Sequence, residues 1–177
     1  MEEIKIVIGS YGSYAACNDR ALGSEWLCLS DFETWDEVAE ELKKEGFALD
    51  GIDEELFVQD VDGLPSDAAE RNPRELFETL KESGVLADEY KQEVMEAFCE
   101  IETFDEFARR VNEDGDSWDD DINLWAGRDL YTLGRELMHD CYEIPDFLDD
   151  YINYEDWARD LRFDGFFEYS GGIIEIR

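Results

Sequence analysis

An excess of negative charge constrains the fold of this chain more than any other feature of its sequence. The 177 residues include 49 Asp and Glu but only 15 Lys and Arg, so the formal net charge at pH 7 is −34. Carboxylates that repel one another oppose a compact fold. The chain is nevertheless 44% hydrophobic and 14% aromatic, whereas disordered acidic segments are poor in such residues. We therefore expect a folded protein with an acidic surface.

The negative charge is distributed along the whole chain. The net charge is −12 over residues 1–60, −8 over residues 61–110 and −14 over residues 111–177. An acidic tail would concentrate the charge at one end of the sequence, and this chain does not. The distribution predicts that the partner presents a long positive surface and not a point site.

The periodicity of apolar residues predicts an α+β fold, arranged as an elongated chain of three small domains. Residues 1–64 have the pattern of an α+β domain, residues 65–112 are helical throughout, and residues 113–177 are again α+β. Residues 9–25, rich in Gly, Ser and Asn, are expected to form a loop, and Pro145 is expected to break the chain. The expected strands lie near 4–8, 26–29, 56–61, 122–125, 163–169 and 173–176, and the expected helices near 34–45, 72–84, 88–101, 103–111, 129–140 and 153–161.

The sequence offers little catalytic or metal-binding chemistry. His139 is the only histidine, and no G-x-S-x-G motif accompanies it, so we expect a surface or boundary histidine and no catalytic pair. The acidic stretch 112–123 fails as a calcium loop, because Ser117 stands where Gly is required and Asn123 where Glu is required. We predict no enzymatic activity, no cofactor and no bound metal.

The cysteines and the apolar runs indicate in which cellular compartment the protein is expected. The four cysteines are widely spaced and form no C-x-x-C pair, so we expect buried, free thiols in a reducing cytoplasm. No apolar run approaches the ~20 residues of a membrane span, and no signal-peptide pattern opens the chain. Conventional nucleic-acid binding needs basic patches. We therefore expect a cytoplasmic protein without membrane or direct nucleic-acid contacts.

The amount of charge converts into a length of DNA. Duplex DNA carries one negative charge per ~1.7 Å of helix axis, so 34 charges match roughly 17 base pairs, or about 58 Å. A compact globule of this length would have a radius of gyration near ~16 Å and a diameter of about 40 Å. Carboxylates accept the same Arg and Lys contacts as phosphates. An elongated acidic protein is therefore suited to compete for a DNA-binding groove.

Three blocks of sequence resemble those of the ArdA-type antirestriction family. The opening strand is followed by Gly12-Ser13-Tyr14 and by Leu22-Gly23-Ser24-Glu25-Trp26, which resemble the N-terminal block of the family. Residues 54–62 (EELFVQDVD) resemble its next strand and turn. Residues 151–161 (YINYEDWARDL) are similar to its Tyr-x-x-Tyr-x-x-x-Ala-Arg-Asp-Leu block. The blocks span nearly the whole chain.

The resemblance implies a function that the residues alone do not give. Proteins of this family are elongated homodimers of three small domains and are carried by mobile genetic elements. They mimic bent B-form DNA and occupy the DNA-binding groove of type I restriction-modification enzymes, blocking restriction and often modification. By the same resemblance, residues 113–177 form the expected dimerisation region. The alternative is an acidic binding module or chaperone for another basic DNA-binding protein.

Two sets of residues are candidates for this function. The first set contains exposed acids that would substitute for phosphates: Asp114, Asp116, Asp119, Asp120, Asp121, Asp146, Asp149, Asp150 and Asp156. The second set contains the apolar residues of the C-terminal block, which would either form a dimer contact or pack in the core at helical spacing: Tyr151, Tyr154, Trp157 and Leu161.

Overall fold

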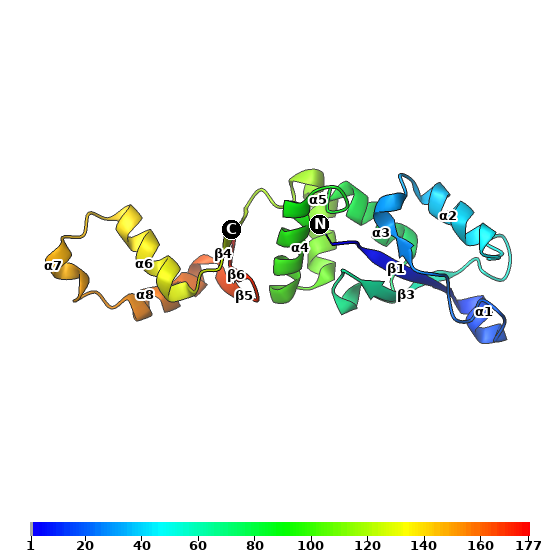
Figure 1. Ribbon diagram of the computed structural model, residues 1–177, viewed down its shortest axis with the longest axis horizontal. Helices are drawn as coiled ribbons and strands as arrows, with labels where there is room; N and C mark the ends of the chain where they lie inside the picture. Colours follow the sequence, from blue (N-terminus) through cyan, green and yellow to red (C-terminus); the bar gives the residue numbers. More distant parts are fainter. Residues whose placement is uncertain (1) are drawn as a thin grey trace.

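The computed structural model describes residues 2–177, and its elements lie along one long axis (Figure 1). One end holds three helices, α6 (Leu130–Cys141), α7 (Asp146–Asp149) and α8 (Tyr154–Asp160). The opposite end holds α1 (Tyr11–Ala16) and α2 (Trp35–Lys44), and α4 (Glu89–Ile101) and α5 (Phe104–Asp114) lie between the two ends. The mixture of helices and strands agrees with the expected α+β class.

The N-terminal sheet is antiparallel and has the strand order β2-β1-β3. Its central strand β1 (Lys5–Ser10) buries Ile6 and Ile8 completely. The outer strands are β2 (Leu27–Cys28) and β3 (Leu56–Asp62). Buried side chains of α2 and of α3 (Pro73–Glu82) join the same apolar cluster as β1, so these helices complete the core around the sheet.

The C-terminal sheet is also antiparallel, with the order β4-β6-β5. It consists of β4 (Ile122–Ala126), β5 (Phe166–Tyr169) and β6 (Gly172–Ile176). Neighbouring residues of a strand point to opposite faces of a sheet. Accordingly, Ile174 belongs to the larger apolar cluster, whereas Ile173 belongs to a smaller one formed with α6 and α8. This sheet is therefore packed on both faces.

The helix starts follow the local capping signals. Asn72 accepts hydrogen bonds from the backbone N–H groups of Arg74 (2.9 Å) and Glu75 (3.3 Å), and Pro73 takes the first helical position of α3. Thr103 accepts from the Glu106 N–H at 3.2 Å and starts α5 in the same way. Such bonds satisfy donors that a helix terminus leaves without partners, which explains why these starts were predictable.

One buried cluster extends across all three predicted domains. It contains Ile6 of the N-terminal sheet, Phe98 of α4 and Ile174 of the C-terminal sheet. Trp118 adds a polar anchor, because its Nε1 donates to the Ser83 carbonyl at 3.0 Å. The division at residues 1–64, 65–112 and 113–177 stays a prediction, and this cluster supplies the contacts between its proposed units.

The structure corrects one expectation about local structure. The segment 9–25, expected to be a loop, contains the helix α1, whose start is capped by the Ser10 side chain. Pro145 stands in extended backbone between α6 and the short helix α7, which agrees with the expected break. Four short 3₁₀ helices complete the described chain: Leu29–Asp31, Ser66–Ala68, Gly115–Ser117 and Leu161–Asp164.

The cysteines depart in part from the expectation of buried thiols. All four are free, but Cys17 and Cys141 are exposed, and Cys28 is partly exposed. Cys99 fits the expectation best, because burial raises the pKa of its thiol to about 12. Within residues 2–177, no helix has the length and apolar character that crossing a membrane requires.

Candidate functional surface

The carboxylates of this protein face solvent almost without exception. Within residues 2–177, only Asp53 and Glu175 are buried among the 49 acidic residues. Both have partners: Asp53 accepts a hydrogen bond from the Ala48 N–H at 2.8 Å, and Glu175 pairs with Arg177 at 2.6 Å. Buried charges need such partners. The other carboxylates of the described chain are at least partly exposed.

The positive charges are bound to the protein's own acids. Within the described chain, every Lys and Arg side chain except Arg20 lies within 4.0 Å of a carboxylate oxygen. Arg20 in turn acts electrostatically on Asp53. The cations are therefore interspersed among acids, and the excess charge that remains is negative in every part of the fold.

The acids of residues 114–121 divide into two kinds. Asp116, Asp119 and Asp121 hold cations of neighbouring helices: Lys91 of α4 pairs with Asp116 at 2.8 Å and with Asp119 at 3.4 Å, and Arg110 pairs with Asp121 at 2.7 Å. The side chain of Asp119 is only 12% exposed. These three acids therefore fasten the turn after α5 to the helices.

Two other acids of this segment are better placed to receive a partner. Asp114 and Asp120 are exposed, and neither forms an ion pair within residues 2–177. Their charge is not offset locally. The role of all five acids as substitutes for phosphates stays a prediction, and it is strongest for these two.

The C-terminal acids surround a hydrogen-bonded hub at Asp149. Its carboxylate accepts from the Tyr154 hydroxyl (2.5 Å), pairs with Arg135 of α6 (2.5 Å) and contacts His139 Nε2 (2.9 Å). Hydrogen bonding from Tyr154, followed by Arg135 and His139, holds the pKa of Asp149 below its usual range despite partial burial. Asp149 therefore links α7 to both α6 and α8. His139 is exposed, as expected.

The remaining C-terminal candidates differ from Asp149 in their contacts. Asp156, at the start of α8, pairs with Arg159 at 2.7 Å and accepts from Asn153 Nδ2 at 2.6 Å. Asp146 and Asp150 are exposed on α7 and at its end, and neither forms an ion pair within the described residues. Asp146 and Asp150 thus keep their full charge for a partner.

The four apolar candidates do not form one surface. Tyr154 and Leu161 are 5% and 4% exposed. Trp157 packs against the apolar cluster that contains Leu161, and its Nε1 donates to the Gly134 carbonyl at 3.0 Å. Core packing accounts for these three residues. Tyr151 is 84% exposed and stands apart from them. Its role in a dimer stays a prediction.

Tyr151 belongs to a group of exposed apolar residues that the sequence pattern does not predict. Phe147 and Leu148 of α7 are 73% and 42% exposed, and Tyr142 just before this helix is 58% exposed. We call Tyr142, Phe147, Leu148 and Tyr151 the α7 patch. Two of these residues lie on α7 and two flank it in the sequence, and contiguous exposed apolar residues often mark an interaction site. In the sequence, Phe147 and Leu148 stand between Asp146 and Asp149. The surrounding acids draw attention to charge, and these two apolar residues are the only sequence feature that points to the patch.

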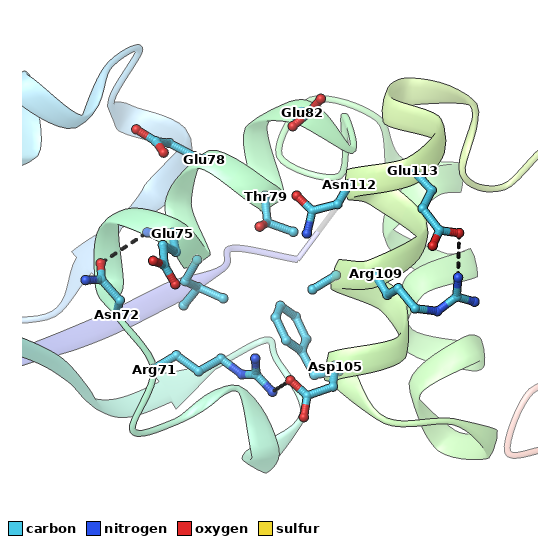
Figure 2. Close-up of a pocket in the computed structure, with 13 residues that line it drawn as sticks. Arg71, Asn72, Glu75, Glu78, Thr79, Glu82, Asp105, Arg109, Asn112 and Glu113 are labelled. Carbon is cyan, nitrogen blue, oxygen red and sulfur yellow. Dashed lines mark hydrogen bonds and ion pairs between the residues drawn. The ribbon is translucent and has the colours of Figure 1, made fainter.

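A groove of about 640 Å³ runs between α3 and α5 (Figure 2). Its apolar lining consists of Leu76, Phe104 and Ala108. Figure 2 shows Glu75 on the α3 side, Glu113 on the α5 side, and a paired Arg71 and Asp105 between them. No sequence pattern predicts this groove, because it depends on how the two helices are placed in space.

A row of acids on α4 shows how closely the carboxylates crowd. Glu93, Glu96 and Glu100 are exposed and stand at the three- and four-residue spacing that puts side chains on one face of a helix. Partial burial raises the pKa of Glu96, and the neighbouring charges of Glu2, Glu93 and Glu100 raise it further. The fold thus tolerates like charges that a cationic partner would relieve.

No metal centre is formed by the part of the chain that the structure describes, since no three His, Cys, Asp or Glu side chains there are arranged to hold an ion.

A model of the family described as antirestriction protein (ArdA) matches residues 6–175, nearly the whole chain. This match confirms the family that the sequence blocks indicated. No curated protein matches the chain.

Proposed function

Because this chain belongs to the ArdA family of antirestriction proteins, we propose that it blocks restriction by imitating B-form DNA. In this proposal the protein occupies the DNA-binding groove of a type I restriction-modification enzyme and excludes DNA from it. The same occupation would hinder modification, because both reactions require the DNA to be bound. The mechanism needs no catalytic residue.

The observation that carries the proposal is the arrangement of charge. Within residues 2–177, acids are buried only at Asp53 and Glu175, and nearly every cation is bound to an acid of the same chain. An excess of 34 negative charges is therefore presented along an elongated molecule (Figure 1). A DNA-binding groove is lined with Arg and Lys, which bind carboxylates as they bind phosphates.

A competition experiment tests this proposal. Added protein should displace labelled DNA from a purified type I restriction-modification enzyme in proportion to its concentration, and both cleavage and methylation should fall in parallel. The affinity should decrease as the salt concentration rises. If DNA stays bound while this protein binds a nucleoid or histone-like protein tightly, the acidic binding module becomes the better proposal.

We also propose that the protein forms a homodimer through its C-terminal region, with the α7 patch at the contact. Phe147 and Tyr151 are the most exposed members of this patch. Aromatic residues are enriched at the centres of protein interfaces. The paired change Phe147→Ser and Tyr151→Ser should convert dimers into monomers in analytical ultracentrifugation. Tyr14→Ser, at an exposed residue of α1, serves as the control and should leave the dimer intact.

A further inference from the structure

The groove between α3 and α5 already holds a guanidinium group. The Arg71 guanidinium lies 4.9 Å from the centre of the Phe104 ring and pairs with Asp105 at 2.7 Å. Its Nε also donates to the Asp67 carbonyl at 3.0 Å. An aromatic face beside a carboxylate is a favourable environment for arginine, because the planar cation stacks and pairs at once. The lining of this groove is therefore suited to arginine.

The rim of the groove also carries carboxylates without a cation. Glu75 and Glu82 line it from α3, and neither forms an ion pair within residues 2–177. Glu78 stands between them and is bound to Arg74 at 2.7 Å. Since Glu75 and Glu82 are seven residues apart, they are separated by about 10 Å along the helix axis. One metal ion could not contact both carboxylates across that separation. One or two cationic side chains could reach them.

We propose that this groove receives an arginine-bearing segment of the restriction-modification enzyme. The aliphatic stem of the arginine lies in the groove beside the partly exposed Ala108, and its guanidinium pairs with Glu75 or Glu82. The volume of about 640 Å³ lies within the range of sites that bind ligands much larger than an ion. This inference rests on the proposed function, because it takes the cation from the DNA-binding surface of that enzyme.

Charge complementarity selects this occupant over others. The acids that line the groove outnumber its two arginines, and both arginines are already paired, Arg71 with Asp105 and Arg109 with Glu113 (Figure 2). A nucleic acid would be repelled by the uncompensated carboxylates. A basic protein segment would bring the missing cations and also fill a groove of about 640 Å³, which neither a phosphate backbone nor a small cation does.

A matched pair of double variants tests the inference. Glu75→Gln with Glu82→Gln removes two charges from the groove, and Glu54→Gln with Glu55→Gln removes two exposed charges elsewhere. The dissociation constant for the purified type I enzyme should rise about tenfold or more for the groove pair, because hydrogen bonds to charged groups are lost. It should rise less than about threefold for the control pair. An equal loss for both pairs would overturn the inference.

A second variant fills the groove without changing the charge. Asn112→Trp places a large ring at its lining, and Ala15→Trp places the same ring at an exposed residue of α1 outside it. After circular dichroism and thermal melting confirm the folds, Asn112→Trp should weaken binding while Ala15→Trp should not. Unimpaired binding by Asn112→Trp would contradict the inference. If the unmodified protein does not bind the enzyme, the proposed function itself fails. If the unmodified protein binds and the groove variants bind as tightly as their controls, only the groove proposal is refuted.

Discussion

At the scale of single residues, Asp53 shows how the chain uses one carboxylate for its own structure. It accepts hydrogen bonds from the Ser13 hydroxyl at 2.5 Å and from the Ala48 N–H at 2.8 Å. Burial opposes its ionised form, but hydrogen bonds from Ser10, Ser13 and Ala48 outweigh that effect and lower its pKa. Asp53 thereby fastens α1 to the turn that precedes β3.

Replacing Asp53 should destabilise the fold. In Asp53→Asn, a neutral amide replaces the carboxylate and cannot accept both bonds, so the free energy of unfolding should fall by about 1–3 kcal/mol. Urea unfolding at pH 7 measures the loss, with the exposed Asp50→Asn as the control. Because the pKa of Asp53 is lowered by folding, its stabilisation is present above the unfolded pKa of about 3.9 and disappears as the pH falls through the folded pKa. The two proteins should therefore become equally stable in acid.

Unlike the buried Asp53, each exposed acid should contribute little on its own to inhibition of the enzyme. Asp120→Asn removes one exposed charge, and exposed ion pairs are worth about 0–1 kcal/mol. Inhibition of a type I enzyme should therefore weaken by less than about fivefold. Titration of DNA cleavage against inhibitor concentration measures the change. Complete loss of inhibition in this variant would contradict a mechanism that relies on distributed charge.

At the scale of elements, the four-residue helix α7 depends on contacts made by one residue. Asp149→Asn weakens the bonds to Tyr154, Arg135 and His139, so the segment 142–153 should exchange its backbone amide hydrogens several-fold faster. Hydrogen-exchange mass spectrometry measures this, and Asp150→Asn, at an exposed acid without an ion pair in the described chain, is the control. Since the pKa of Asp149 is lowered, the protection should also fade as the pH falls through it. Equal exchange in both variants would refute the hub.

The elements also show which parts of the fold were predictable. The helix α3 was expected because Asn72 and Pro73 mark its start locally, and the β5–β6 hairpin because a short Gly-rich turn joins two apolar runs. The helix α1 was missed because its stability comes from a distant partner, the bond between Ser13 and Asp53 across 40 residues. The groove was not predictable either, since it depends on the packing of α3 against α5.

The candidate surface was predicted in its chemistry but not in its detail. The sequence indicated acidic runs, and the structure separates Asp119, which binds Lys91, from Asp120, which has no ion pair in the described chain. The sequence pattern leaves Tyr154 and Leu161 open between core packing and a dimer contact, and the structure buries both within their own chain. Burial and pairing depend on tertiary placement, which local sequence does not specify.

At the scale of the whole molecule, salt should act in opposite directions on stability and on binding. Raising NaCl from about 0.1 M to about 1 M shortens the Debye length from about 10 Å to about 3 Å. Screening relieves the self-repulsion of 34 excess charges, so the melting temperature of the free protein should rise. The same screening should weaken binding to the enzyme at least tenfold. Scanning calorimetry and titration calorimetry measure the two effects, and a falling melting temperature would contradict the argument.

The pairing of nearly every cation with an acid of the same chain has a consequence for the surrounding solution. The remaining negative charge must be balanced by dissolved Na⁺ and K⁺, which gather along the molecule as they do along DNA. DNA releases part of this ion cloud when a protein binds, and the entropy gained drives association. An enzyme that accepts this protein in place of DNA would release ions from the inhibitor in the same manner. The protein would then resemble DNA in the counterions that surround it as well as in the positions of its negative charges.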